Sequence, residues 1–224
     1  MVEGAGAGAV TTAGTGYLVA PVSGSGPGVL VLHSWWGLTP FFRQTCDRFA
    51  DEGFVALAPD LHGGRTADRP DEAEALLAEI DPNPTAALVL SSAATLRGLA
   101  ITPDHPIGVV GFSMGASWAL WLSARAVDVV GAVVAFYGAQ RIDFEGSRAS
   151  YLAHWAEHDE FVDDDEIAFL EATLGLERRP LEFHRYPGTG HWFFESDRAP
   201  AFDEAAAELA WRRTIDFLRR ELVT

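Results

Sequence analysis

The stretch Ile107-Gly-Val-Val-Gly-Phe-Ser-Met-Gly115 decides the fold. It begins as a short apolar run typical of a buried strand, passes through Gly111-x-Ser113-x-Gly115, and continues as a helical segment to about Arg125. This context is that of a nucleophile elbow, a turn so sharp that a Cβ at either glycine would collide with the neighbouring strand or helix. The stretch therefore predicts that Ser113 is a nucleophile; the alternative is a glycine-rich turn with a purely structural role.

Backbone N–H groups near Ser113 are candidates for stabilising a developing oxyanion. The helix that follows directs its unpaired N–H groups at the serine, so Met114 N–H is the first candidate donor. The loop His33-Ser-Trp-Trp-Gly37 follows the apolar run 29–32 and is expected at the same edge of the sheet, which makes Trp35 N–H the second candidate. Alternatively, the tryptophans of this loop simply plug one end of the core.

Length and composition indicate a single soluble domain. Residues 1–224 suffice for one α/β core but not for that core plus a large cap domain. No apolar run approaches the roughly 18 to 20 residues of a membrane span. Residues 1–9 lack the basic and leucine-rich regions of a signal peptide and are interpreted as a flexible tail. Cys46, the sole cysteine, excludes an intrachain disulfide and fits a cytoplasmic location.

The charge pattern argues against a polyanionic partner. The formal net charge is −16, and all 16 basic residues are arginines that are scattered rather than gathered into a stripe. Nucleic acid is therefore an unsuitable partner, and the excess of acidic residues serves solubility.

Apolar runs alternate with helical segments along the whole chain. We expect strands at 16–22, 29–32, 54–58, 107–112, 129–136, 151–156 and 181–186, and helices at 40–52, 71–79, 85–99, 113–125, 162–174 and 199–222. Pro21 favours an edge position for the first strand, and the prolines of Asp81-Pro-Asn-Pro84 separate two helices. The pattern predicts an α/β fold with a mainly parallel central sheet and helices on both faces.

A serine nucleophile needs a base, and the base needs an acid that fixes its tautomer. His191 follows the last strand in a glycine-rich loop and is the predicted base, the alternative being a surface loop histidine. Asp159 follows the preceding strand and is the predicted acid, with Glu157 as its competitor. Three further aspartates, Asp163, Asp164 and Asp165, are assigned instead to the acidic first turn of the next helix.

Metal and thiol chemistry are not expected. His154 and His158 would share one side of a helix, but their segment has the pattern of a strand and offers no third ligand. Cys46 lies within a helix without an evident base, so a core thiol is expected.

Five motifs together resemble the dienelactone hydrolase family of the α/β-hydrolase superfamily. They are His33-Ser-Trp-Trp-Gly-Leu38, Ala58-Pro-Asp-Leu-His-Gly-Gly-Arg65, Gly111-Phe-Ser-Met-Gly115, Asp159 with Val162, and Gly190-His191 followed by aromatic residues. The family nucleophile is typically cysteine, and the family usually has a glutamate where Ser34 stands. Serine at both positions is coherent, because a serine nucleophile has no thiolate to control.

The resemblance implies cleavage of a small ester or lactone through an acyl-enzyme, without a cofactor. Substrate contacts are expected from the oxyanion-loop residue Trp35 and from Ser34, Trp36, His62, Arg65, Tyr137, Trp192 and Phe193. The family holds a substrate carboxylate with two arginines; Arg65 matches the first, but Glu195 replaces the second, so neutral esters are expected to be preferred. Two alternatives stay open, a binding or scaffold protein without turnover and an acyltransferase that uses the same triad, and the oligomeric state is not predicted.

Overall fold

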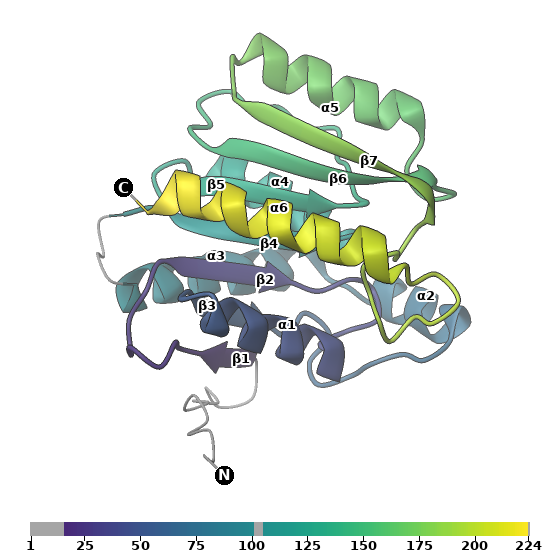
Figure 1. Ribbon diagram of the computed structural model, residues 1–224, viewed down its shortest axis with the longest axis horizontal. Helices are drawn as coiled ribbons and strands as arrows, with labels where there is room; N and C mark the ends of the chain where they lie inside the picture. Colours follow the sequence, from purple (N-terminus) through teal and green to yellow (C-terminus); the bar gives the residue numbers. More distant parts are fainter. Residues whose placement is uncertain (1–15, 101–104, 224) are drawn as a thin grey trace.

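A seven-stranded sheet lies between two layers of helices (Figure 1). The computed structural model describes residues 16–100 and 105–223, so the expected tail at 1–9 lies outside the described residues. The strand order is β1-β3-β2-β4-β5-β6-β7. The strands are β1 (Gly16–Val19), β2 (Gly28–Leu32), β3 (Val55–Pro59), β4 (Ile107–Phe112), β5 (Val130–Phe136), β6 (Ser150–His158) and β7 (Leu181–Gly190).

Among the strands of the described residues, β1 alone runs antiparallel to its neighbour, and it occupies the edge position that was predicted for the first strand. The remaining pairs, from β2·β3 to β6·β7, are parallel. Strands β2, β4 and β5 are buried almost throughout because helices cover both of their faces. These features confirm the predicted mainly parallel α/β-hydrolase fold.

Two hydrophobic clusters, one on each face, hold the helices to the sheet. Helices α1 (Pro40–Asp51) and α6 (Glu204–Leu222) cover one face, where Phe42, Phe49 and Phe217 are fully buried. Helices α3 (Pro82–Leu99), α4 (Met114–Arg125) and α5 (Asp164–Leu176) cover the other. The short helix α2 (Pro70–Ala78) packs through Ala73 and Leu76 on Trp36, beside the carboxyl ends of the strands.

The boundary predicted for α3 is wrong. The helix begins at Pro82 instead of at residue 85, and the Asp81 carboxylate accepts a hydrogen bond from Asn83 N at 3.0 Å. Pro82 and Pro84 both fall in the first turn, where a missing N–H leaves no intrahelical bond unmade. Proline therefore starts this helix instead of separating it from the segment before.

Other boundaries also differ from the expected ones. Strand β1 ends at Val19 rather than 22, and β7 extends to Gly190, so that part of the expected loop before His191 is strand. Helix α5 begins at Asp164, after Asp163 has capped Glu166 N. Helix α6 begins at Glu204 rather than 199, because Asp203 supplies the cap for Ala206 N.

The elbow glycines have the role that the sequence predicts. A Cβ on Gly111 would collide with the Gly115 carbonyl, and one on Gly115 would collide with the carbonyls of Leu32 and His33. Helix α4 therefore packs directly on β2 and β4 after a turn at Ser113, whose φ is 53°. This close approach places the serine at the start of the helix and at the end of the central strand.

No helix within the described residues has both the length and the apolar character needed to cross a membrane.

Candidate active site

The carboxyl ends of the parallel strands bring four distant parts of the chain together. Four of the strands end just before residues of interest: β4 before Ser113, β5 before Tyr137, β6 before Asp159 and β7 before His191. The loop that begins at His33 follows β2 at the same edge of the sheet. Parallel strands place their ends at one rim, and open α/β sheets bind ligands there.

Ser113, His191 and Asp159 form a continuous chain of hydrogen bonds. Ser113 Oγ lies 2.8 Å from His191 Nε2, and His191 Nδ1 lies 2.8 Å from both carboxylate oxygens of Asp159. The side chains of His191 and Asp159 are 3% and 7% exposed, so water competes little for these bonds. The arrangement suits a serine whose proton is taken by a histidine held in one tautomer.

The turn after β6 orients the Asp159 carboxylate. Its Oδ1 accepts hydrogen bonds from Phe161 N at 2.9 Å and from Val162 N at 3.1 Å. The competing acid, Glu157, instead accepts a bond from Gly188 N at 2.7 Å. The backbone therefore directs Asp159, and not Glu157, toward the histidine.

The candidate oxyanion donors lie on either side of Ser113. Met114 is the first residue of α4, so its N–H has no partner within the helix. Trp35 lies in the loop after β2, against which the start of α4 packs at Gly115. Both positions are compatible with the expected donors, and the dipole of α4 favours negative charge at the same point.

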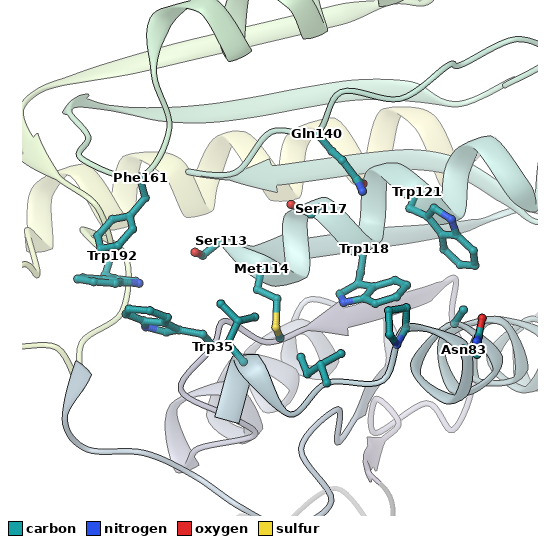
Figure 2. A pocket seen from close by; sticks show the side chains of 14 residues that line it. Trp35, Asn83, Ser113, Met114, Ser117, Trp118, Trp121, Gln140, Phe161 and Trp192 are labelled. Atoms are coloured by element: carbon teal, nitrogen blue, oxygen red, sulfur yellow. The ribbon is translucent and has the colours of Figure 1, made fainter. Parts of the chain in front are cut away.

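An apolar cavity of about 690 Å³ opens at Ser113 (Figure 2). Its walls come from the loop after β2 (residues 33–37, the oxyanion loop), the α2–α3 connection, one face of α4 and the loops after β5, β6 and β7. The lining residues are Trp35, Leu77, Ile80, Pro82, Asn83, Ala86, Ser113, Met114, Ser117, Trp118, Trp121, Gln140, Phe161 and Trp192. None of them is charged, and the volume is typical of a small-molecule site.

Most of the expected substrate contacts lie elsewhere. Trp35 and Trp192 line the cavity, and their rings stack with centroids 5.6 Å apart. Ser34, Trp36, His62, Tyr137 and Phe193 are absent from the lining and are at most 4% exposed. They pack beneath the site because the loops that carry them fold inward against the core. The expectation that these five line the pocket is therefore corrected.

Arg65 is also outside the cavity lining. Its guanidinium forms an exposed ion pair with Glu79 at 2.6 Å. An arginine held in this way is not placed to neutralise a substrate carboxylate in the cavity, so the expected anion contact is corrected.

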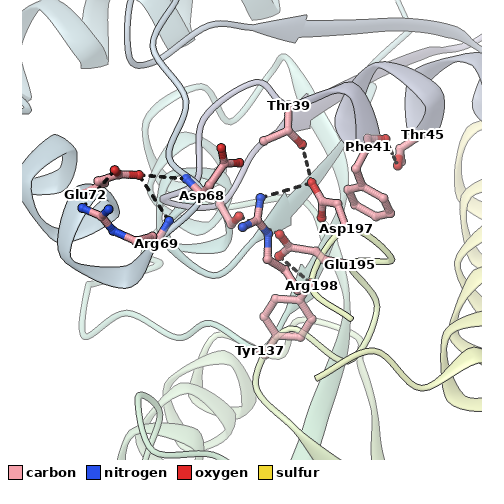
Figure 3. A network of polar contacts seen from close by, with 11 residues as sticks. Thr39, Phe41, Thr45, Asp68, Arg69, Glu72, Tyr137, Glu195, Asp197 and Arg198 are labelled. Carbon is pink, nitrogen blue, oxygen red and sulfur yellow. Dashed lines mark hydrogen bonds and ion pairs between the residues drawn. The ribbon is translucent and has the colours of Figure 1, made fainter. Parts of the chain in front are cut away.

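Glu195 is not at the mouth of the site, contrary to the sequence-based expectation. It is fully buried, with Tyr137 Oη 2.9 Å from Oε1 and Ser34 Oγ 2.9 Å from Oε2 (Figure 3 shows the Tyr137 contact). Desolvation raises the pKa of Glu195 to about 8, against the opposing effect of the Tyr137 hydrogen bond. This carboxyl group thus links Tyr137 to Ser34 in the core and does not lie at the rim.

Further contacts connect the segment that follows His191 to the loop after β2, which carries Trp35. Thr39 Oγ1 donates to Asp197 Oδ2 at 2.9 Å, and the Arg198 guanidinium lies over the Trp36 ring at 4.2 Å (Figure 3 shows the Thr39–Asp197 bond). With the Ser34–Glu195 bond they connect residues 34–39 to residues 195–198. The positions of Trp35 and His191 therefore depend on one another.

His33 supports the oxyanion loop from within the core. Its Nδ1 donates to the Ser34 carbonyl at 2.7 Å and its Nε2 accepts from Leu61 N at 3.0 Å, which fixes the neutral tautomer. Burial lowers the pKa of His33 to about 4. The ring therefore remains uncharged at neutral pH and ties the loop after β2 to the loop after β3.

Metal and thiol chemistry receive no structural support in the part of the chain that the structure describes. No three of its His, Cys, Asp or Glu side chains are grouped as metal ligands. His154 lies on a strand, as predicted, and is buried between Tyr186 and Thr214. Cys46 lies in the core, as predicted, and burial raises the pKa of its thiol.

Sequence reasoning missed two groups of residues. Trp118 and Trp121 line the cavity together with Met114, and their helical spacing was visible but is shared by ordinary core stripes. The link from Glu195 to Tyr137 and Ser34 spans 58 and 161 residues, and no local pattern announces it.

Comparison with known proteins gives a consistent result. A model of the dienelactone hydrolase family matches residues 15–222. The chain is 34% identical to Protein usf of Aquifex pyrophilus, over 92% of this chain and 93% of that protein. It is 28% identical to a carboxymethylenebutenolidase of Rhodococcus opacus, over 89% and 83%. The structure of a thermophilic esterase from Thermogutta terrifontis has a TM-score of 0.73 at 16% identity, over 99% of this chain and 95% of that chain, and supports the fold alone.

Proposed function

The chain belongs to the dienelactone hydrolase family, and on that premise we propose that it is a serine hydrolase which cleaves neutral carboxylic esters or lactones through an acyl-enzyme on Ser113. The observation that carries this proposal is the unbroken contact from Asp159 through His191 to Ser113 at the edge of an apolar cavity. A nucleophile, its base and the acid that orients the base are the groups that acyl transfer requires.

The first half of the reaction transfers the acyl group to the protein. His191 Nε2 takes the Ser113 proton as Oγ attacks the ester carbonyl carbon, and Asp159 stabilises the imidazolium that forms. Met114 N–H and Trp35 N–H hold the oxyanion. When the tetrahedral intermediate collapses, the bond between the acyl carbon and the alcohol oxygen breaks, and His191 returns the proton to the departing alcohol.

The second half regenerates the serine. His191 takes a proton from water, the hydroxide attacks the acyl-enzyme, and the bond to Ser113 Oγ breaks as His191 returns the proton to it. The products are one carboxylic acid and one alcohol, or a single hydroxy acid when the substrate is a lactone. Neither step needs a cofactor, because the three side chains supply both the nucleophile and the proton transfers.

Labelling by a serine-directed fluorophosphonate, run beside ester turnover, tests the nucleophile. Ser113→Ala is expected to abolish labelling and to lower kcat/KM by roughly 10³-fold or more. Asp159→Asn is expected to lower kcat by up to roughly 10⁴-fold in a folded protein, because His191 loses the acceptor that fixes its tautomer. Ser91→Ala, at an exposed serine of α3, is the matched control and retains both properties.

Two outcomes would contradict the proposal. Labelling that survives Ser113→Ala would assign the nucleophile elsewhere, and a folded protein without any ester turnover would favour a binding role. Product analysis in the presence of an added alcohol separates hydrolysis from acyl transfer, because transfer would yield a new ester instead of the free acid.

A further inference from the structure

We propose that Ser113 divides the cavity into an alcohol lobe beside His191 and an acyl lobe along α4, and that the acyl lobe selects esters of medium-length apolar acids over acetates. This inference rests on the proposed function, since it assigns the two halves of the ester to the two sides of the nucleophile. It is carried by the shape of the cavity, by the chemistry of its walls and by the direction of proton transfer.

The acyl lobe is a groove whose floor is one face of α4. Met114, Ser117, Trp118 and Trp121 are spaced three, four and seven residues from the first of them, so they share that face. At 1.5 Å per residue, the helix carries the groove about 12 Å from Ser113 to Trp121. Such a length accommodates a chain far longer than an acetyl group.

The opposite wall of the groove comes from α2, α3 and the segment between them. It consists of Leu77, Ile80, Pro82, Asn83 and Ala86, so that hydrocarbon in the groove meets mainly apolar atoms on both sides (Figure 2). The Ser117 hydroxyl already donates to the Ala139 carbonyl at 3.1 Å. The groove holds no charged group and is therefore suited to an apolar chain rather than to a carboxylate.

The alcohol lobe lies on the other side of Ser113, where Figure 2 shows Trp35, Phe161 and Trp192. Phe161 and Trp192 each have a ring centroid 4.8 Å from that of His191. Phe161 packs on Trp35 at 5.6 Å and on Trp192 at 5.1 Å. These three rings form an aromatic enclosure beside the base.

Proton transfer decides which half of the ester occupies which lobe. His191 must protonate the departing alcohol oxygen, so the alcohol leaves from the side on which the imidazole lies. The acyl carbon is bonded to Ser113 Oγ, and its chain extends into the remaining space. That space is the groove along α4.

The test varies the acid while the alcohol is held constant, with p-nitrophenyl acetate, butyrate, hexanoate and octanoate. Each methylene buried in the groove is expected to raise kcat/KM by about twofold to fourfold, because burial of one methylene contributes about that factor to binding in the transition state. Ala86→Phe narrows the groove and is expected to lower the octanoate-to-acetate ratio of kcat/KM by about tenfold or more. Ala87→Phe, on the exposed side of the same helix, is the matched control and leaves the ratio unchanged.

A second arm tests the orientation. Phe161→Ala is expected to change the ratio of kcat/KM between phenyl butyrate and ethyl butyrate. The dependence of kcat/KM on the length of the acyl chain is expected to stay the same. An Ala86→Phe variant that changed the ranking of alcohols, with the acyl profile intact, would reverse the assignment of the lobes and overturn the proposal.

The outcomes separate this inference from the proposed function. Acetate turnover that depends on Ser113, combined with a flat chain-length profile or a profile unaffected by Ala86→Phe, would overturn the acyl groove and leave the hydrolase intact. Absence of Ser113-dependent turnover on every ester would overturn the proposed function itself.

Discussion

At the scale of single residues, backbone strain gathers around the site. Among residues 16–100 and 105–223, four non-glycine residues have positive φ, and three of them are Ser113, Tyr137 and Trp192. Each such conformation costs about 1–3 kcal/mol and persists only where packing enforces it. Tyr137 contacts His191 with ring centroids 4.9 Å apart, and Trp192 follows His191 directly. The packing of this region therefore holds Ser113, and the two residues that lie against His191, in backbone conformations that are unfavourable by themselves.

The raised pKa of Glu195 predicts that the stability of the protein depends on pH through this one side chain. Its pKa is about 8 in the folded protein and 4.5 in a model peptide, so between these values the native state holds a proton that the unfolded state releases. This contribution is fully present below pH 4.5 and is lost as pH rises toward 8. We expect the native protein to lose a few kcal/mol relative to Glu195→Gln between pH 5 and pH 9, since each pKa unit corresponds to about 1.4 kcal/mol.

Urea unfolding of the native protein and of Glu195→Gln at pH 5, 7 and 9 measures this difference. Glutamine keeps the shape of the side chain and can bond to both Tyr137 and Ser34, so it removes the titration without emptying the site. A difference in unfolding free energy that stays constant over this range would mean that Glu195 is ionised in the folded protein throughout.

At the scale of elements, the start of α3 connects helix capping to the cavity. The Asp81 carboxylate caps Asn83 N at 3.0 Å, and the first two residues of the helix line the groove. Two prolines restrict the backbone of this turn, but the cap supplies an acceptor that they do not. Fraying of this helix terminus would therefore displace the residues that form the groove wall.

Asp81→Ala is expected to reduce the free energy of unfolding by about 1 kcal/mol and to lower the octanoate-to-acetate ratio, because the frayed turn no longer closes the groove. Asp203→Ala removes the corresponding cap of α6, whose acceptor lies 2.9 Å from Ala206 N and which does not line the cavity. A similar loss of stability with an unchanged ratio is expected for that control. If both variants changed the octanoate-to-acetate ratio equally, the start of α3 would have no specific role in forming the groove.

At the scale of the whole molecule, the protein has a net charge of −16, whereas the residues that line the cavity are uncharged. An anionic substrate approaches an unfavourable potential and finds no cation in the lining to offset it. The sequence predicted a preference for neutral esters from Glu195, but Glu195 is buried. The same preference now follows from the negative net charge of the protein and from the absence of a cation in the cavity lining.

We expect phenyl butyrate to exceed monophenyl succinate in kcat/KM by roughly tenfold or more at low salt, and the ratio to shrink as added salt screens the field. Steady-state assays of both esters at low and moderate salt measure it. A preference for the succinate would indicate that an arginine moves into the cavity when substrate binds.

Much of this architecture could be predicted because its signals are local. Apolar runs bounded by turns identified each strand, and the positions of Ser113, Asp159 and His191 directly after β4, β6 and β7 place them at one rim. Helix starts were harder, since at α3, α5 and α6 a capping aspartate, and not the apolar pattern, selects the first residue.

Local periodicity and turn chemistry determine where the strands, the helices and the elbow lie along the chain, because each of these signals depends on neighbours within a few residues. The alternation of strands and helices then favours a parallel sheet, whose carboxyl-terminal rim receives Ser113, Asp159 and His191. The destination of Glu195, the ion pair of Arg65 and the walls of the groove depend on how segments far apart in the chain pack. Side-chain burial is a property of that packing, and a polar residue at the same sequence position can face water or the core. Tertiary structure therefore decided that the glutamate lies in the core and that the tryptophans of α4 line the cavity.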